Sequence, residues 1–323
     1  MKSSYLCNDL NYGDIINASL FNLNPKLIVE FGILQGFSLK IFAENFPNAD
    51  IRAYDIFDKF NGNSADKNII ELFREYKNVK IDYGDFYEKY KEMRDIDILH
   101  VDIANNGDVL EFVIENYLPN MSKNGLIIFE GGSKERDEVE WMNKFNKKKI
   151  NPVIEKLKNR LDIKIRTIGQ FPSITFLKKD ENFNIHELNL MDFDKGFFSL
   201  VNYFTKKLEE DSLRRAKENI NLFNNDNVKT LVVEYNGKII GTGKIYVENK
   251  IHNNLKNVGH IEDMIIDEDF RKNNVGTLIL KRLIEIGRDN NCYKIILDCH
   301  PEVSSFYEKN GFIKKGTEMC IYY

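Results

Sequence analysis

The sequence lacks the marks of a membrane, secreted or zinc-binding protein. No apolar run approaches the roughly 18 residues that span a bilayer, and the Met1 segment lacks the basic start and apolar core of a secretory signal. Its four cysteines (Cys7, Cys292, Cys299 and Cys320) have no short paired spacing, which argues against a zinc site and suits a reducing compartment. We therefore expect a soluble, cytoplasmic protein with free, buried thiols.

The chain also lacks an excess of positive charge. Residues 1–180 carry 26 basic and 28 acidic side chains, and residues 181–323 carry 20 and 22. Binding a nucleic-acid backbone normally needs a basic excess, so we expect no nucleic-acid partner. Because 323 residues exceed the usual size of one domain, we expect two domains, at 1–180 and 181–323.

The first half alternates short apolar runs with helical patterns, which predicts an α/β domain with a parallel sheet covered on both faces. Strands are expected at 27–31, 51–54, 79–81, 96–101, 125–129, 163–167 and 173–177. Helices are expected at 37–46, 66–76, 109–118, 135–145 and 152–161. The last two strands flank a turn at 169–172, as in a closing antiparallel hairpin. The polar stretch 178–183 is the expected linker, and beyond it we expect strand, two helices, three strands, helix, strand, helix and strand.

A glycine turn and a series of strand-end acids predict a nucleoside-cofactor site in this half. Glycines after the first strand let the backbone approach a ligand, and the following helix offers unpaired N–H groups. An acid ending the second strand is placed to accept hydrogen bonds from ribose hydroxyls. The residues concerned are Glu30, Gly32, Gly36, Ser38, Asp55, Asp85, Asp102 and Glu130.

The spacing Glu-x-Gly-x-x-x-Gly, with these acids, resembles class I S-adenosylmethionine-dependent methyltransferases of sugars and small hydroxylated metabolites. That resemblance implies a Rossmann-like, seven-stranded fold. It places Glu30, Gly32 and Gly36 around the amino-acid part of S-adenosylmethionine, Asp55 at the ribose, Asp85 near the adenine, and Asp102 and Glu130 toward the acceptor. Some such enzymes hold Mg²⁺ on strand-end carboxylates. Here asparagines and glycines replace the usual acids around Asp102 and Glu130, so we expect no metal.

Four motifs follow in order in the second half. A strand ends on Glu262 and Asp263, and residues 271–277 form an anion-binding turn that opens a helix. A further strand ends on Asp298, and Tyr307 lies on a short helix. Neighbours on a strand point to opposite faces unless a bulge intervenes, so Glu262 and Asp263 share a face only at a bulge. The series resembles the GNAT N-acetyltransferases, most closely those acting on glucosamine 6-phosphate, and covers about the last 140 residues.

This resemblance implies an α/β GNAT fold and assigns roles to individual residues. Glu262, Asp263 and Asp298 would hold or deprotonate the acceptor, and Tyr307 would protonate the coenzyme A thiolate. Acetyl-CoA would bind Met264, Ile265 and Ile266, then the turn formed by Arg271, Lys272, Asn273, Asn274, Val275, Gly276 and Thr277. The family's turn is richer in glycine, but asparagine tolerates left-handed backbone. Thr205, Lys250, His252, Tyr293 and Lys294 would surround a sugar phosphate, partly across a homodimer formed by this domain.

The sequence thus predicts a bifunctional sugar-modifying enzyme that uses acetyl-CoA and S-adenosylmethionine on an amino sugar or sugar phosphate. Two alternatives stay open. The acetyl acceptor could be another amine, such as a nucleotide-linked amino sugar, because the chain ends without the arginine that binds phosphate in relatives. The first domain could be a non-catalytic binding or dimerisation module.

Overall fold

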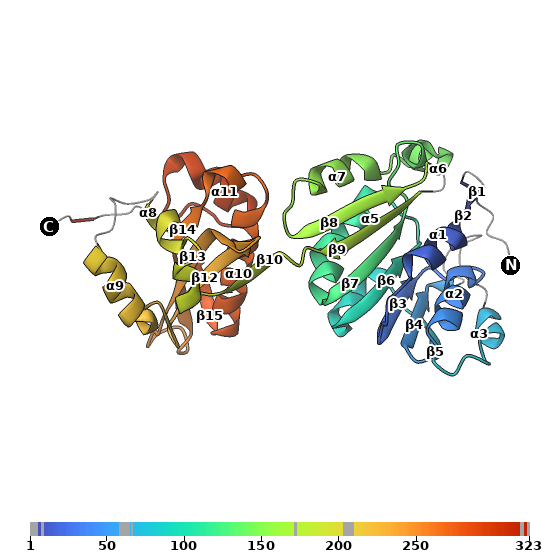
Figure 1. Cartoon of the computed structure of the whole chain (residues 1–323), viewed down its shortest axis with the longest axis horizontal. Helices are drawn as coiled ribbons and strands as arrows, with labels where there is room; N and C mark the ends of the chain where they lie inside the picture. The colour runs from blue at the N-terminus through green and yellow to red at the C-terminus, as the bar shows by residue number, and fades with distance from the viewer. Residues whose placement is uncertain are drawn as a thin grey trace. The chain divides into compact units, whose positions relative to one another are not determined.

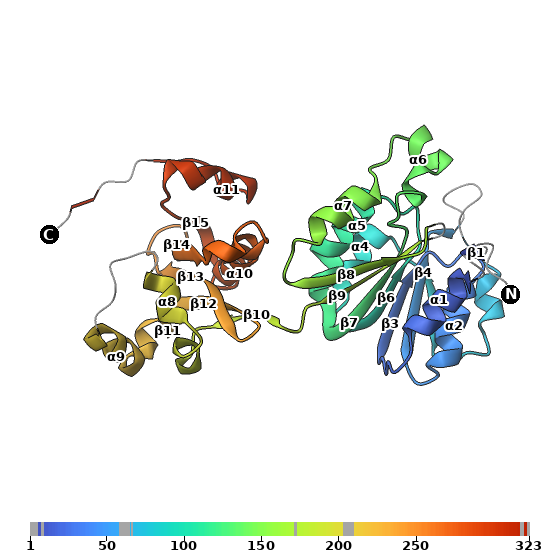
Figure 2. The ribbon, with the colours of Figure 1, turned by 45° about the horizontal axis from the view of Figure 1, so that its top comes forward.

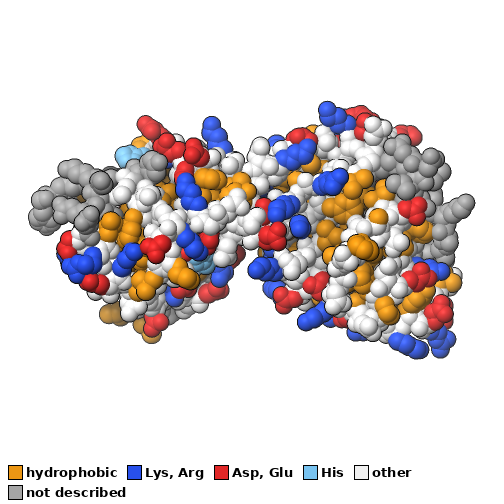
Figure 3. Space-filling model, viewed as in Figure 1, with side chains coloured by type: hydrophobic (Ala, Val, Ile, Leu, Met, Phe, Trp, Pro, Cys, Tyr) orange, Lys and Arg blue, Asp and Glu red, His pale blue; other side chains and the backbone are white. Residues whose placement is uncertain are grey.

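The computed structural model describes residues 6–7, 10–57, 65, 67–170, 173–202, 210–316 and 320–321 (Figure 1). The chain divides into two units, Met1–Glu181 and Asn182–Tyr323. Acidic and basic side chains are interspersed on the visible face of each unit (Figure 3). Within the described residues, no helix combines the length and the apolar character needed to cross a bilayer.

The N-terminal unit is built on a seven-stranded sheet. Its strands are β3 (Leu27–Phe31), β4 (Asp50–Asp55), β5 (Val79–Tyr83), β6 (Ile96–Val101), β7 (Met121–Glu130), β8 (Ile163–Ile168) and β9 (Ile174–Lys179). They lie in the order β5-β4-β3-β6-β7-β9-β8, and β9 is antiparallel to both β7 and β8. All seven expected strands and the closing hairpin are therefore present. A separate pair is formed by β1 (Leu6–Cys7) and β2 (Leu10–Asn11).

Helices cover both faces of this sheet (Figures 1 and 2). They are α1 (Tyr12–Ser19), α2 (Phe37–Asn45), α3 (Ile69–Leu72), α4 (Phe86–Lys89), α5 (Gly107–Phe112), α6 (Glu140–Lys144) and α7 (Ile150–Leu157). Apolar residues of α5 and α7 form one core, and those of α1 and α2 form the other, so both faces of the parallel strands are buried. Three expected helices are shorter than predicted. The helix at 66–76 is reduced to α3, α5 passes into a π-helical turn at Val113–Tyr117, and the helix at 135–145 splits into Arg136–Glu138 and α6.

The C-terminal unit has a mostly antiparallel sheet in the order β10-β12-β13-β14-β15. The strands are β10 (Phe183–Glu187), β11 (Asn224–Asn225), β12 (Val228–Tyr235), β13 (Lys238–Glu248), β14 (Asn257–Ile266) and β15 (Cys292–Ile296). The helices are α8 (Phe197–Asn202), α9 (Glu210–Glu218), α10 (Val275–Asp289) and α11 (Ser304–Lys309). Helix α8 packs on Val232, Ile239 and Ile265, whereas α10 contacts Gly241 and Gly243 from the other face.

Three expectations need correction. The boundary between the units, between Glu181 and Asn182, lies within the expected linker 178–183, but the linker is shorter than expected, because β9 continues to Lys179 and β10 begins at Phe183. Lys179 stays in the sheet because its long side chain carries the ammonium to the Met121 carbonyl, 2.7 Å away. The expected final strand has no counterpart among the residues described after α11, and 317–319 and 322–323 lie outside that description. The thiols of Cys292, Cys299 and Cys320 are free as expected, but Cys299 and Cys320 are exposed and Cys292 is half-buried.

Candidate functional site

A β-bulge lies at the centre of the predicted acetyl-transfer site. Thr242 pairs with Ile265 and Lys244 pairs with Glu262, so Gly243 alone faces two residues, Asp263 and Met264. Asp263 adopts a left-handed φ of 52°. A Cβ atom on Gly243 would lie 2.5 Å from the Met264 sulfur, so only glycine leaves room for the bulge. The sequence did not reveal this bulge, although a Gly-x-Gly pair in a predicted strand is a signal for one.

The bulge brings Asp263 to the face that carries Glu262. Lys244, directly opposite Glu262, makes an ion pair of 2.5 Å between its Nζ and Asp263 Oδ2. Partial burial raises the pKa of Glu262, and the charges of Asp263 and Asp298 raise it further, whereas Lys244 and His260 lower it. Glu262, Asp263 and Asp298 therefore form an acidic cluster.

The turn before α10 adopts the left-handed backbone angles that usually require glycine, although residues other than glycine occupy these positions. Lys272 and Asn274 have φ angles of 67° and 68°. Asn274 is the N-cap residue, yet its side chain makes no capping hydrogen bond. The first N–H groups of α10 are therefore left without a side-chain cap, which suits binding of an anion such as a pyrophosphate.

Tyr307 lies on α11, beside this turn. A Cβ atom on Gly276 would lie 3.3 Å from the Phe306 ring, so α11 packs close to the start of α10. The Tyr307 ring is half-buried, with centroids 5.0 Å from Phe306 and 6.0 Å from Phe312. Burial raises the pKa of Tyr307, and the charge of Cys299, next to Asp298 in the chain, raises it further. The phenol therefore keeps its proton at neutral pH.

The residues expected at the sugar phosphate lie on exposed segments of this unit. Lys250 pairs with Glu248, and His252 is exposed. Tyr293 and Lys294 lie on the edge strand β15, with the Lys294 ammonium 5.6 Å from the Tyr293 ring centroid. Thr205 lies outside the described residues.

In the N-terminal unit, the glycine turn packs on the end of β6. Gly32 has a φ of 87°, and a Cβ atom there would collide with the Asp102 carbonyl oxygen. Gly36, in the left-handed conformation, is the N-cap of α2. Asp102 is therefore held beside the turn, as expected for two parallel strands ending at one edge.

Glu30 is fully buried and belongs to a chain of polar groups. Its Oε1 accepts a hydrogen bond from Ser38 and lies 2.8 Å from His100 Nδ1. His100 Nε2 lies 3.1 Å from the Tyr12 hydroxyl. Glu30 Oε2 has no hydrogen-bond partner among the described residues. The sequence did not single out Tyr12 or His100, and the expected cofactor residues Glu30 and Ser38 bind each other.

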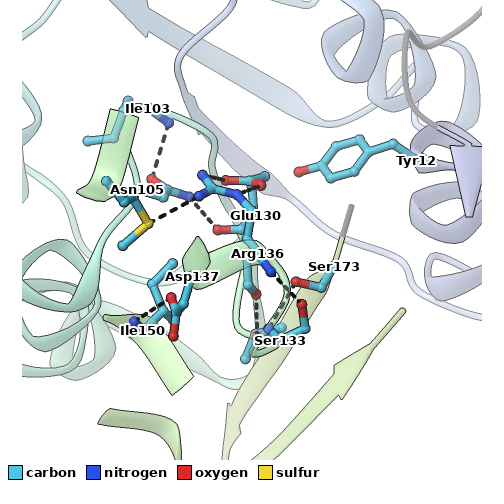
Figure 4. A network of polar contacts seen from close by, with 12 residues as sticks. Tyr12, Ile103, Asn105, Glu130, Ser133, Arg136, Asp137, Ile150 and Ser173 are labelled. Atoms are coloured by element: carbon cyan, nitrogen blue, oxygen red, sulfur yellow. Dashed lines mark hydrogen bonds and ion pairs between the residues drawn. The ribbon is translucent and has the colours of Figure 1, made fainter. Parts of the chain in front are cut away.

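Glu130 differs from the expectation that it faces an acceptor. Arg136 donates to both carboxylate oxygens, over 2.5 and 2.7 Å, and both side chains are nearly buried (Figure 4). The Tyr12 ring lies across from this pair, with its hydroxyl pointing toward it (Figure 4). No sequence signal identified Arg136. Its guanidinium is the cation that Glu130 binds, so Asp102 and Glu130 do not fit an Mg²⁺ site.

Asp102 remains accessible to solvent, although the surrounding protein partly desolvates it. This desolvation raises the pKa of Asp102 to about 7, with further contributions from the charges of Glu130 and Glu30. Asp55 and Asp85 organise the backbone around them. Asp55 accepts hydrogen bonds from the N–H groups of Ile33 and Phe57, both over 2.9 Å, and Asp85 caps α4.

Within the described ranges, one group of side chains has metal-ligand spacing: His186, Asp192 and Glu234. Lys195 lies 2.8 Å from Glu234 and 3.9 Å from Asp192. The lysine ammonium already supplies the positive charge at this cluster.

Residues 192–312 match the model of the acetyltransferase (GNAT) family. Glucosamine 6-phosphate N-acetyltransferase 1 of Oryza sativa subsp. japonica is 33% identical over 147 residues, which are 44% of this chain and 88% of that protein. The enzyme of the same name from Dictyostelium discoideum is 34% identical over 148 residues, 44% of this chain and 92% of the relative. The crystal structure of the Arabidopsis thaliana enzyme is 34% identical, with a TM-score of 0.41, and matches 44% of this chain and 98% of its own.

A bulged strand followed by a left-handed turn and an uncapped helix start thus occurs within a segment that matches an acetyltransferase model. Through this segment, the chain belongs to the acetyltransferase (GNAT) family.

Proposed function

We propose that the C-terminal unit transfers an acetyl group from acetyl-CoA to the amine of an amino sugar of the glucosamine 6-phosphate type. One observation carries the proposal. Glu262 and Asp263 at the β14 bulge lie shortly before the left-handed turn of α10 in the chain, within a segment 33% identical to a glucosamine 6-phosphate N-acetyltransferase.

Acetyl-CoA would supply an activated thioester. The backbone of Met264, Ile265 and Ile266 would pair with its extended arm as an added strand. The turn from Arg271 through Lys272, Asn273, Asn274, Val275 and Gly276 to Thr277 would hold its pyrophosphate, because N–H groups at a helix start favour anions.

The acidic cluster would hold the acceptor. Glu262 and Asp298 would orient the amine and take up its proton, and Asp263 would bind sugar hydroxyls. The amine nitrogen attacks the acetyl carbon, the carbon–sulfur bond breaks, and Tyr307 gives its proton to the departing sulfur. The amine would attack the thioester directly, without an acyl-enzyme. Burial raises the pKa of Tyr307, so the phenol holds the proton that the departing sulfur would take.

Lys250, His252, Tyr293, Lys294 and Thr205 would bind the sugar phosphate, some from the second subunit of a homodimer. Strand β15 supports this arrangement, because among the described residues it is the last strand of the sheet, with Tyr293 and Ile296 about 40% exposed. Such an edge is suited to pairing with a second copy.

For the N-terminal unit, we propose S-adenosylmethionine-dependent methylation of a sugar or small hydroxylated metabolite. Its support is the position of Glu30, Asp55 and Asp102 at the carboxyl ends of neighbouring parallel strands, where such folds bind ligands. A non-catalytic binding module is the second candidate. Asn105 favours it, because its amide donates to the carbonyls of Val101 and Glu130 and so has a structural role.

Mass spectrometry of sugars incubated with the full chain and both cofactors tests these proposals. We expect an acetyl mass gain on glucosamine 6-phosphate that exceeds the gain on glucosamine or a nucleotide-linked amino sugar. No preference for the phosphate would favour the other amine acceptors. Calorimetry with S-adenosylmethionine separates the proposals for the first unit, since absence of binding to the folded chain supports the non-catalytic module.

A further inference from the structure

Lys244 is a charged residue of the acidic cluster for which the proposed chemistry has no role. It lies on β13 in register with Glu262, and its side chain is 13% exposed. Its Nζ lies 2.5 Å from Asp263 Oδ2 and 5.1 Å from the centroid of the Tyr246 ring. These two contacts hold a largely buried cation against Asp263, on the strand position paired with Glu262.

The bulge allows the contact between Lys244 and Asp263. In a regular strand, Asp263 would point away from Glu262 and Lys244. Its left-handed backbone, at φ 52°, instead lets the carboxylate reach the lysine. The ion pair therefore ties the conformation of the bulge to the position of Asp263.

Charged groups from β13, from β14 and from the segment after β15 act on the ionisation of Glu262. Lys244 from β13 and His260 from β14 favour the carboxylate, whereas Asp263 from β14 and Asp298 after β15 disfavour it. His260 is itself held by Glu248, 3.0 Å away. Burial lowers the pKa of Lys244, but its hydrogen bond and charge interaction with Asp263 outweigh this effect and raise that pKa overall. The lysine thus stays charged at neutral pH.

We propose that Lys244 is a positioning residue for acetyl transfer, which holds the Asp263 carboxylate and keeps a positive charge opposite Glu262 when the acceptor binds. The inference rests on the proposed acetyltransferase function. It also bears on specificity. With Asp263 neutralised by an internal cation, Glu262 and Asp298 are the acids left for one acceptor ammonium, and Asp263 is left for hydroxyl groups.

The test compares Lys244→Met, Lys244→Arg and wild type in the full chain, with acetyl-CoA and glucosamine 6-phosphate between pH 5 and 9. In Lys244→Met we expect the acidic limb of kcat/KM to move about 0.5 to 1 pH unit upward, because Glu262 loses a nearby positive charge. On the acidic limb, this shift corresponds to a fall in kcat/KM of about three- to tenfold, and we expect Lys244→Arg to restore both the limb and the rate. Lys229→Met removes a similar ion pair, with Glu187 3.1 Å away on another part of the sheet, and should leave the profile unchanged.

Lys244→Met with a wild-type pH profile would overturn the inference. So would a uniform loss of activity that Lys244→Arg does not rescue, because a merely structural role predicts that result. If wild type itself fails to acetylate glucosamine 6-phosphate, the proposed function fails instead. Carbon NMR titration of glutamate-labelled protein, with Glu262 assigned through Glu262→Gln, then decides the role of Lys244 without activity. An unchanged Glu262 titration in Lys244→Met refutes it.

Discussion

The left-handed backbone of Lys272 leads to an unusual prediction about glycine and alanine. Glycine normally destabilises a folded chain relative to alanine, because it loses more backbone entropy. At Lys272, with its φ of 67°, the order should reverse. An L-residue in this region costs roughly 1 to 2 kcal/mol, and the entropic disadvantage of glycine is roughly 0.5 to 1 kcal/mol. We expect Lys272→Gly to be more stable than Lys272→Ala by about 0.5 to 1 kcal/mol.

Lys281, an exposed residue within α10, provides the matched control. There, Lys281→Gly should be less stable than Lys281→Ala by about 1 kcal/mol. Both variants of each pair lose the same ammonium group, so the difference in stability within a pair reports the effect of the backbone conformation. The single tryptophan, Trp141, belongs to the N-terminal unit and cannot report this effect. Hydrogen exchange of the α10 amides can report this effect. Equal or greater stability of Lys272→Ala would refute the assignment of strain to this turn.

Three further predictions concern the bulge and the N-terminal unit. Gly243→Ala places a methyl group 2.5 Å from the Met264 sulfur. It should lower the free energy of unfolding, measured by hydrogen exchange, by about 1 to 3 kcal/mol. An unchanged free energy of unfolding would contradict the tight packing at the bulge. Arg136→Met leaves the nearly buried Glu130 carboxylate without its cation. It should destabilise the N-terminal unit by about 3 to 5 kcal/mol, as measured by urea unfolding with tryptophan fluorescence. An unchanged unfolding curve would refute a strong ion pair. The pKa of Asp102 is raised to about 7, so the folded state holds one more proton than the unfolded state between roughly pH 4 and 7. The contribution of Asp102 to the free energy of unfolding therefore falls as the pH rises through that window, and it is constant above roughly pH 7. Asp102→Asn should abolish this slope, and an unchanged slope would assign it to other groups.

The pattern of apolar runs was enough to predict the sheet of the N-terminal unit. Its parallel strands are buried on both faces, so each appears as a continuous apolar run between helices. The helix expected at 135–145 was harder to predict. The segment 135–145 is interrupted because Arg136 pairs with Glu130, and Asp137 accepts hydrogen bonds from the N–H groups of Ile150 and Asn151. These partners lie outside the expected helix, 6, 13 and 14 residues away, and the local apolar period does not register them.

The expected linker illustrates the same limit. Lys178 and Lys179 look like solvated linker residues, yet their backbone groups pair with β8 in the register Lys164–Lys178 and Ile163–Lys179. Strand pairing depends on the neighbouring backbone, and a long lysine side chain can lie along a sheet edge and still reach a polar partner. Polarity alone therefore placed the end of β9 too early.

Apolar periodicity and turn chemistry are local properties, so the sequence was enough to predict the seven strands of the N-terminal sheet and the acidic residues at their ends. It also marked Glu262, Asp263, Asp298 and Tyr307 through their spacing. Folding of the chain was needed to show that a bulge turns Asp263 toward Lys244, and that Arg136 binds both oxygens of Glu130. The first contact depends on strand register and the second on the burial of two charges at the end of a strand, and neither is specified until the chain has packed.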